Sequence, residues 1–166
     1  MIVVLMGVCG SGKTTTGRAL ATALGWPFHD ADDFHPPANV AKMAAGIPLV
    51  DADRWPWLDR IVDALADAGA DKANVVLACS ALRQIYRERI VRAGNVRFVY
   101  LKGDRETIAA RLAGRSHQYM PPSLLPSQFA TLEEPADAIV VDIRTDVAAQ
   151  VAVIRDALKL STPAST

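Results

Sequence analysis

The chain has 166 residues, of which 51% are hydrophobic, and its 18 lysines and arginines balance its 18 aspartates and glutamates. This length suits one domain that buries its own core, and the balanced charge provides no global field to recruit nucleic acid. No apolar run approaches the roughly 20 residues of a membrane-spanning helix, so neither a nucleic-acid nor a membrane partner is expected. Two cysteines in unrelated segments, Cys9 and Cys79, have no metal-ligand spacing and favour a reducing cytoplasm.

The first apolar stretch, residues 1–6, is typical of a β-strand and leads through a glycine-rich loop into a helix-forming segment. Residues 7–14 read Gly-Val-Cys-Gly-Ser-Gly-Lys-Thr and match the phosphate-loop pattern G-x-x-x-x-G-K-[ST] at every fixed position. The glycines allow successive backbone N–H groups to point at one anion, and the N-terminus of the helix adds its partial positive charge. A simple glycine-rich turn would explain neither the Lys-Thr pair nor its register. The loop therefore predicts binding of ATP, through Gly7, Gly10, Ser11, Gly12, Lys13, Thr14 and Thr15, and of Mg²⁺, through the Thr14 hydroxyl.

Strand and helix patterns alternate along the rest of the chain. Strands are expected within 26–33 and at 75–79, 96–101 and 139–143, and helices at 14–24, 36–45, 58–68, 82–91, from 104, at 124–132 and at 147–158. This alternation predicts an α/β fold, in which helices cover both faces of a parallel sheet and ligands bind beyond the carboxyl ends of the strands. The domain is expected to span residues 1–160, followed by a frayed tail over 161–166.

Two carboxylates, Asp30 and Asp32, end the second predicted strand, on the same side and one residue apart. One could hold Mg²⁺ through water while the other accepts a proton from a substrate hydroxyl. The strand at 75–79 ends in Cys-Ser, not in the aspartate of a Walker B strand, so the metal's second carboxylate is expected from this pair. Which aspartate is the base and which is linked to the metal stays open, and a capping role is favoured for Asp33.

Arg54 lies among Asp51, Asp53 and two tryptophans, and two interpretations stay open for it. It is either a surface ion pair or a fork for a substrate carboxylate.

A polar, basic segment at about 114–122 separates two predicted helices and, with Arg111 before it, provides Arg115 and His117. A small phosphotransferase must exclude water and neutralise the charge that moves between donor and acceptor. A mobile basic lid would do both, whereas the alternative is an exposed basic loop.

The order and spacing of several blocks together resemble bacterial-type gluconokinase over nearly the whole chain. These blocks are the phosphate loop and residues 29–36, 39–49, 51–58, 79–83, 100–103, 111–117 and 127–135. The resemblance implies a P-loop kinase-type three-layer αβα sandwich, with a central parallel sheet of about five strands and a lid. It also implies ATP-dependent phosphorylation of D-gluconate at its terminal hydroxyl, giving 6-phospho-D-gluconate, and a homodimer.

The same resemblance implies roles for individual residues. Lys13, Asp32 and Arg115 would be catalytic, Asp30 would join Thr14 at the metal, and Arg111 and Arg115 would contact the nucleotide. The sugar-acid pocket would be lined by Asp32, His35, Arg54, Ser80, Arg83, His117 and Gln128. Two positions depart from the pattern of the family: Cys9 stands where a serine is expected in many relatives, and Arg83 replaces the lysine of some members.

Two alternatives stay open at this point. One is another small-molecule kinase of the same fold, acting on shikimate or a different sugar acid. The other is a nucleotide-dependent binding or switch protein, although a GTPase is disfavoured because the chain has no guanine-reading Asn-Lys-x-Asp motif.

Overall fold

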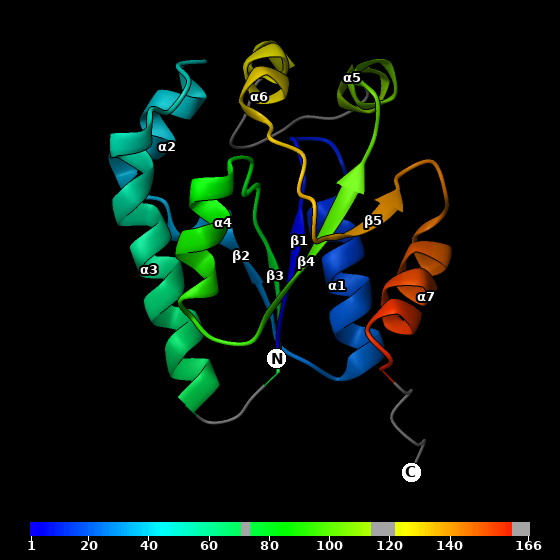
Figure 1. Ribbon diagram of the computed structural model, residues 1–166. Coiled ribbons are helices and arrows are strands. Elements are labelled where there is room, and N and C mark those ends of the chain that lie inside the picture. Colours follow the sequence, from blue (N-terminus) through cyan, green and yellow to red (C-terminus); the bar gives the residue numbers. More distant parts are fainter. Residues whose placement is uncertain (71–73, 114–121, 161–166) are drawn as a thin grey trace.

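A sheet of five parallel strands forms the middle of the structure, a computed structural model that describes residues 1–70, 74–113 and 122–160 (Figure 1). The strand order is β2-β3-β1-β4-β5, so the first strand of the chain occupies the centre. The strands are β1 (Ile2–Met6), β2 (Phe28–Asp30), β3 (Val75–Ala78), β4 (Val96–Lys102) and β5 (Ile139–Asp142). Every residue of β1 and β3 is buried, as expected of continuous apolar strands that are covered on both faces.

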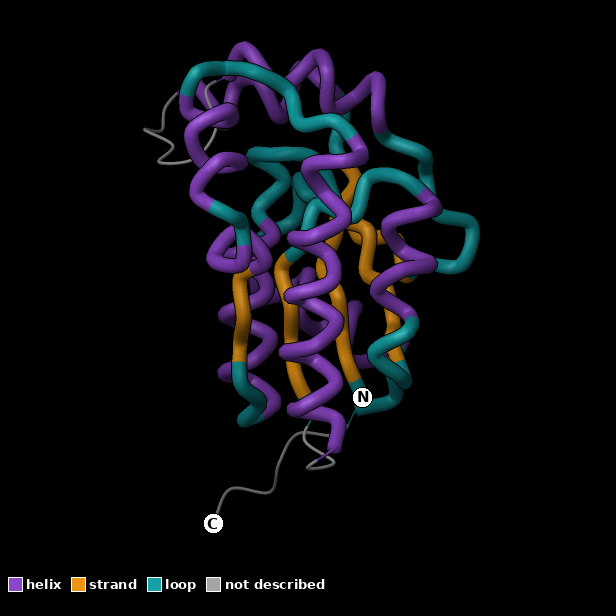
Figure 2. Tube along the Cα trace, turned by 90° about the vertical axis from the view of Figure 1, so that its left-hand side faces the viewer, coloured by secondary structure: helices purple, strands orange, loops and turns teal. Residues whose placement is uncertain are grey.

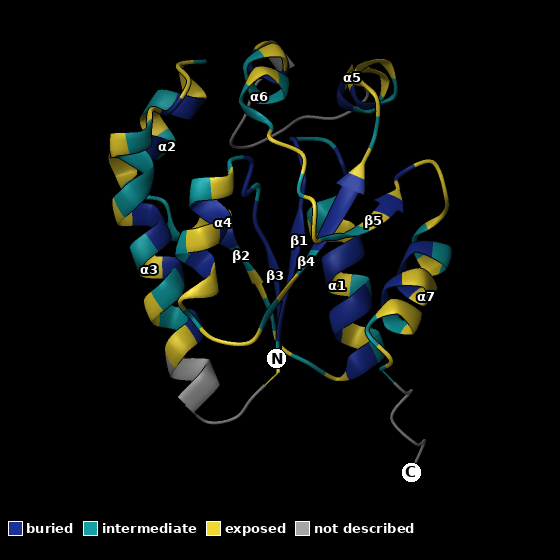
Figure 3. Cartoon of the chain, in the orientation of Figure 1, coloured by how far each residue is buried: buried dark blue, intermediate teal, exposed yellow. Residues whose placement is uncertain are grey.

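Helices cover both faces of this sheet. The α-helices of the described chain are α1 (Lys13–Leu24), α2 (Pro37–Ala44), α3 (Asp51–Ala70), α4 (Gln84–Val91), α5 (Arg105–Ala113), α6 (Leu125–Thr131) and α7 (Val147–Ala157), and α2, α5 and α6 lie beyond the ends of the strands. In Figure 1, α3 and α4 lie to one side of the strands and α1 and α7 to the other, and Figure 2 shows the same layers turned by 90°. Figure 3 shows that the buried residues line the faces that the helices and strands turn toward one another.

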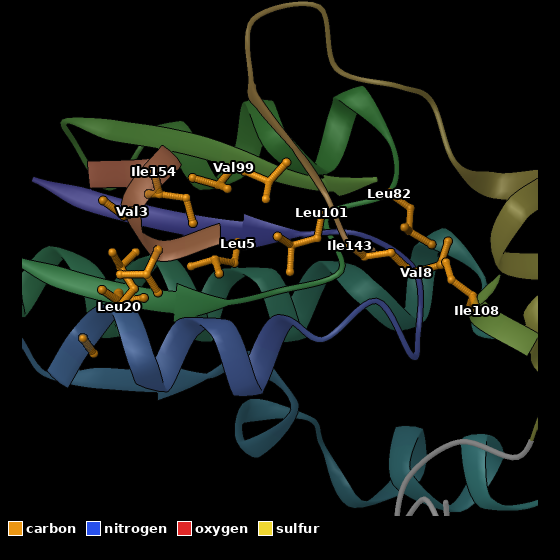
Figure 4. Packing of buried hydrophobic residues seen from close by; sticks show 14 of the residues in the cluster. Val3, Leu5, Val8, Leu20, Leu82, Val99, Leu101, Ile108, Ile143 and Ile154 are labelled. Atoms are coloured by element: carbon orange, nitrogen blue, oxygen red, sulfur yellow. The ribbon is translucent and has the colours of Figure 1, made fainter. Parts of the chain in front are cut away.

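Alternating side chains of β1 build a core on each side of the sheet. Val3 and Leu5 pack with Leu20 of α1 and Ile154 of α7, in the cluster shown in Figure 4. Ile2, Val4 and Met6 enter the opposite core, where they meet apolar side chains of α3 and α4. This period-two division of one strand between two cores is what a three-layer sandwich requires.

Two helix boundaries expected from the sequence are confirmed by their capping contacts. Gly25 ends α1 in the left-handed region, at φ 66°, and its N–H bonds to the carbonyls of Ala21 and Thr22. Asp104 caps α5, because its carboxylate accepts the Thr107 N–H at 2.7 Å.

Two other helix starts differ from the expectation. Helix α3 begins at Asp51 rather than near Leu58, because its acidic first turn suits the helix dipole and the Asp53 carboxylate accepts the Val50 N–H at 3.0 Å. Pro56 lies inside this helix, where it removes one backbone donor without ending the helix. Helix α4 begins at Gln84 rather than at Leu82, since Ala81 has a φ of 43° and Arg83 is extended.

The carboxyl ends of the strands meet at one edge, and the phosphate loop between β1 and α1 lies there. Gly7 has a φ of 146°, and a Cβ at this position would come within 2.9 Å of the Leu101 carbonyl oxygen, so the loop needs glycine here. No helix in the described part of the chain is long and apolar enough to cross a membrane.

Candidate active site

A pocket of about 610 Å³ opens at the carboxyl ends of β1, β2 and β3. Its walls come from the phosphate loop and the first turns of α1, the turn after β2, the end of α2 and the segment before α3, the start of α3, the segment after β3, α4, and α6. The lining includes Lys13, Thr14, Asp30, Asp32, His35, Arg54, Trp57, Ser80, Tyr86 and Gln128. The fold therefore brings the predicted phosphate site and most of the predicted acceptor residues into one cavity, as the rule for ligands in parallel sheets requires.

The phosphate loop delivers its two chemical side chains to the start of α1. Gly12 precedes the helix in a left-handed conformation, at φ 95°, and Lys13 and Thr14 follow directly. The Lys13 ammonium donates to the Val8 carbonyl oxygen at 3.0 Å, across the mouth of its own loop. A cation, the backbone N–H groups of a helix N-terminus and flexible glycines thus surround one space suited to phosphate.

The oxygen donors present suit Mg²⁺. The Thr14 hydroxyl donates to the Asp30 carboxylate at 2.8 Å, so two hard oxygen ligands lie together beside the phosphate loop. Within the described residues no group of three or more His, Cys, Asp or Glu side chains could hold a metal ion. Such a sparse set fits Mg²⁺, which keeps several waters and takes phosphate oxygens as further ligands.

Asp32 differs from Asp30 in its surroundings. Asp30 uses its second oxygen to accept the backbone N–H of Asp32 at 3.2 Å, which caps the turn from Ala31 to Phe34. The carboxylate of Asp32 faces the pocket, with 49% of its side chain exposed. Its pKa is raised above the ordinary value by desolvation and by the charges of Asp30 and Asp33, while Lys13 acts in the opposite direction. A carboxylate that faces a cavity and has a raised pKa can accept a proton from a hydroxyl bound there.

His35 is a neutral, packed side chain at the edge of the same pocket. Only 4% of the side chain is exposed, and its ring stacks on Trp57 with centroids 4.3 Å apart. Desolvation, with a smaller contribution from the Arg54 charge, lowers the pKa of His35 to about 4. The imidazole is uncharged at neutral pH and can act only through hydrogen bonds or packing.

This depressed pKa predicts acid sensitivity. Because the unfolded chain takes up the His35 proton near pH 6.5 and the folded protein only near pH 4, the free energy of unfolding should fall as the pH drops through this interval. The slope from this one group is at most about 1.4 kcal/mol per pH unit. Thermal unfolding of the wild type and of His35→Gln between pH 4 and 6.5 should show a shallower slope in the variant. His29→Gln is the matched control, and equal slopes in wild type and His35→Gln would contradict the prediction.

Arg54 points into the pocket and is held by a neutral partner. Its guanidinium donates to the Tyr86 hydroxyl at 2.8 Å, and the Tyr86 hydroxyl in turn donates to the Asp51 carboxylate. The other oxygen of Asp51 accepts from Arg83 at 2.6 Å. Among the described residues Arg54 has no carboxylate within ion-pair distance, so the surface ion pair considered for it does not form.

Arg83 does not line the pocket, contrary to the expectation from the sequence. Its guanidinium bonds to Asp51 and, at 3.4 Å, to Glu133, and these two carboxylates draw it away from the cavity. Ser80, from the same block, does line the pocket.

Gln128 lies on α6 and reaches the phosphate loop, where its side-chain oxygen accepts the Cys9 N–H at 2.6 Å. Arg111, on α5, donates to the Ile143 carbonyl oxygen beyond β5 and is not part of the pocket wall. Arg115 and His117, with the proposed lid, lie outside the described residues.

Several pocket residues were not predicted from the sequence, and two of them, Tyr86 and Arg18, carry polar groups suited to a ligand. Tyr86 lies within the helix predicted at 82–91, and nothing in the local pattern distinguishes its hydroxyl from a surface one. Arg18 also lines the pocket and has a readable signal, since it follows Thr14 by four residues and so shares its helix face.

Comparison with known proteins identifies the family. The shikimate kinase family model matches residues 9–152. Gluconokinase from Gluconobacter oxydans is 49% identical over 136 residues, which cover 81% of this chain and 76% of that protein. The chain belongs to the gluconokinase family.

Solved structures agree with this assignment. A gluconokinase from Sinorhizobium meliloti superposes with a TM-score of 0.82 at 40% identity, over 95% of this chain and 94% of that chain. A sugar kinase from Janibacter sp. gives a TM-score of 0.91 at 40% identity, over 96% and 95% of the two chains. The expected P-loop kinase-type αβα sandwich with a five-stranded parallel sheet is confirmed for this member of the gluconokinase family.

Proposed function

We propose that this protein transfers the γ-phosphoryl group of ATP to the terminal hydroxyl of D-gluconate, forming ADP and 6-phospho-D-gluconate. The observation that carries the proposal is the joining of three features in one cavity: a phosphate loop, a carboxylate with a raised pKa, and a guanidinium with no carboxylate partner among the described residues. Gluconate offers a hydroxyl at one end and a carboxylate at the other, and these match the second and third features. Its relatives in the comparison bear the name gluconokinase.

The reaction follows from these groups. The acceptor oxygen attacks the γ-phosphorus while the bond to the β-γ bridging oxygen breaks, and Asp32 orients the hydroxyl and receives its proton. Lys13 and the loop N–H groups stabilise the negative charge that develops on the transferred group and on the leaving phosphate. Thr14 and Asp30 would hold Mg²⁺, which when bound neutralises charge on the phosphates.

Arg54 would bind the gluconate carboxylate through the donors that Tyr86 leaves free. A guanidinium has five N–H donors in a planar fork, and a single bond to Tyr86 fixes its orientation without occupying the fork. The Tyr86 hydroxyl also donates to Asp51, so this neighbouring carboxylate is hydrogen-bonded elsewhere and does not compete with the substrate for Arg54.

The Tyr86→Phe variant should therefore raise the KM for gluconate roughly 5- to 10-fold, in keeping with one lost hydrogen bond, and leave kcat within about twofold. Steady-state kinetics with saturating ATP measure both parameters. Tyr100→Phe is a matched control, because Tyr100 is as deeply buried as Tyr86, at 3% against 2% exposed, and does not line the pocket. An unchanged KM in Tyr86→Phe would show that Arg54 is positioned by other contacts.

The deciding experiment is a coupled ADP-release assay with ATP, Mg²⁺ and a panel of acceptors. Gluconate should give sustained turnover, and shikimate and other sugar acids much less. A preference for shikimate or a different sugar acid would overturn the substrate assignment. A single stoichiometric burst of ADP with every acceptor would instead indicate a nucleotide-dependent switch.

We further propose that the enzyme works in the reducing cytoplasm and as a homodimer. Both cysteines are free thiols, which suits a reducing compartment. Sedimentation equilibrium would test the dimer.

A further inference from the structure

The side-chain amide of Asn39 joins the acceptor pocket to the start of α3. Asn39 lies on α2 with only 4% of its surface exposed, and it is absent from the pocket wall. Its nitrogen donates to the Asp53 carbonyl oxygen at 2.8 Å, and the same nitrogen lies 3.3 Å from Nδ1 of His35. A buried amide with two such contacts is fixed in both position and orientation.

The contact with Asp53 decides which way round the amide lies. A backbone carbonyl only accepts hydrogen bonds, so the NH₂ group of Asn39 must face it. The flipped amide would set its oxygen against the Asp53 carbonyl oxygen, and neither atom could donate. One N–H of Asn39 therefore bonds to Asp53, and the second is directed at His35.

The orientation of the amide in turn decides the tautomer of His35. A ring nitrogen that faces an N–H donor must present its lone pair, so Nδ1 is unprotonated. The imidazole is neutral, because burial depresses its pKa, and its single proton is then on Nε2. This Nε2 lies 3.8 Å from Oδ1 of Asp32, the carboxylate that faces the acceptor.

We propose that Asn39 is a positioning residue that fixes His35 as the Nε2–H tautomer, so that the ring presents a donor and not an acceptor to Asp32. This inference rests on the proposed function only for the role of Asp32. A His35 ring of the opposite tautomer would turn a lone pair toward the carboxylate, repel it and compete with it for the proton of the acceptor hydroxyl. With Nε2 protonated, Asp32 is the one proton acceptor of the two. The Nε2–H then gives the carboxylate a favourable electrostatic contact at 3.8 Å, which is longer than a hydrogen bond.

The first test needs no variant of Asn39. Long-range ¹H–¹⁵N correlation spectra of the uniformly labelled protein at neutral pH distinguish protonated from unprotonated ring nitrogens. The chain has three histidines, and loss of one set of signals in His35→Gln assigns the set from His35. A protonated Nε2 with an unprotonated Nδ1 is expected. A protonated Nδ1, or an average of the two tautomers, would overturn the proposal whether or not gluconate is the substrate.

The second test asks whether Asn39 acts through His35. Asn39→Asp replaces the donor with an acceptor, so the proton should move to Nδ1, and kcat with gluconate should fall roughly 10- to 100-fold, as for other orienting partners. In the His35→Gln background the same substitution should change kcat by no more than about twofold, because the ring it orients is gone. Equal losses in both backgrounds would mean that Asn39 supports only the fold, and would overturn the proposal. Gluconate turnover by the wild type, measured in parallel, tests the proposed function separately.

Discussion

Replacing Lys13 with alanine should abolish turnover and leave the fold intact. The side chain lines the pocket and its ammonium donates to the carbonyl oxygen of Val8 in its own loop, so the cores on either side of the sheet do not depend on it. Alanine also suits the first turn of α1. In the wild type the Lys13 ammonium stabilises the negative charge on the transferring phosphoryl group. Removal of one such preorganised group typically lowers kcat by about 10²- to 10³-fold or more.

The measurement pairs the coupled assay with circular dichroism and thermal unfolding of the same preparations. Arg97→Ala is the matched control, since Arg97 is an exposed cation near the start of β4, away from the phosphate loop. It should leave kcat unchanged. Near-normal kcat in Lys13→Ala would remove the phosphate loop from the mechanism.

The Asp32→Asn variant should lower kcat roughly 10²-fold or more, a typical contribution for a general base. Asparagine keeps the shape and one acceptor oxygen but loses the charge and nearly all the basicity. The raised pKa of Asp32 makes the aspartate a stronger proton acceptor than an ordinary carboxylate, so its removal is felt in the chemical step. The affinity for gluconate should change far less, because orientation by the amide oxygen is retained.

The Asp30→Asn variant distinguishes the proposed metal-binding role of Asp30 from the proposed proton-accepting role of Asp32. Asp30 accepts from the Thr14 hydroxyl at 2.8 Å, which places it with the proposed metal ligand. The activity lost in Asp30→Asn should therefore be partly recovered by raising the Mg²⁺ concentration, whereas the activity lost in Asp32→Asn should not. Assays of both variants across a Mg²⁺ series decide the matter, and recovery of Asp32→Asn alone would reverse the two roles.

Local patterns were sufficient for the strands and for the phosphate loop. The apolar runs that form β1 and β3 are buried throughout, as their composition indicates, whereas β4 is buried only over Val99–Leu101. The Gly-Lys-Thr register of the phosphate loop can be recognised from the sequence alone. The start of α3 was missed because Pro56 and two aspartates are typical of a loop. In the structure those aspartates instead suit a helix N-terminus.

The contacts among the side chains of the site could not be read from the sequence. Arg83 and Arg54 both looked like anion-binding groups, and the carboxylates that separate them belong to different elements. Asp51 and Glu133 engage Arg83, whereas Arg54 donates to the neutral hydroxyl of Tyr86 and, in the described part of the chain, has no carboxylate partner. Such a choice depends on which side chains the fold brings together, and no spacing rule within one segment encodes it.

The central place of β1 in the sheet has a consequence for synthesis on the ribosome. The first strand to emerge pairs with β3 and β4, through contacts such as Leu5 with Ala78 and Leu5 with Val99. β1 therefore cannot pair with both neighbouring strands until residues through Lys102 have left the exit tunnel. Until then part of its apolar surface stays exposed. Nascent chains stalled shortly after β3 should accordingly be captured by a holdase chaperone, and those stalled after β4 should begin to gain protection of the β1 amides.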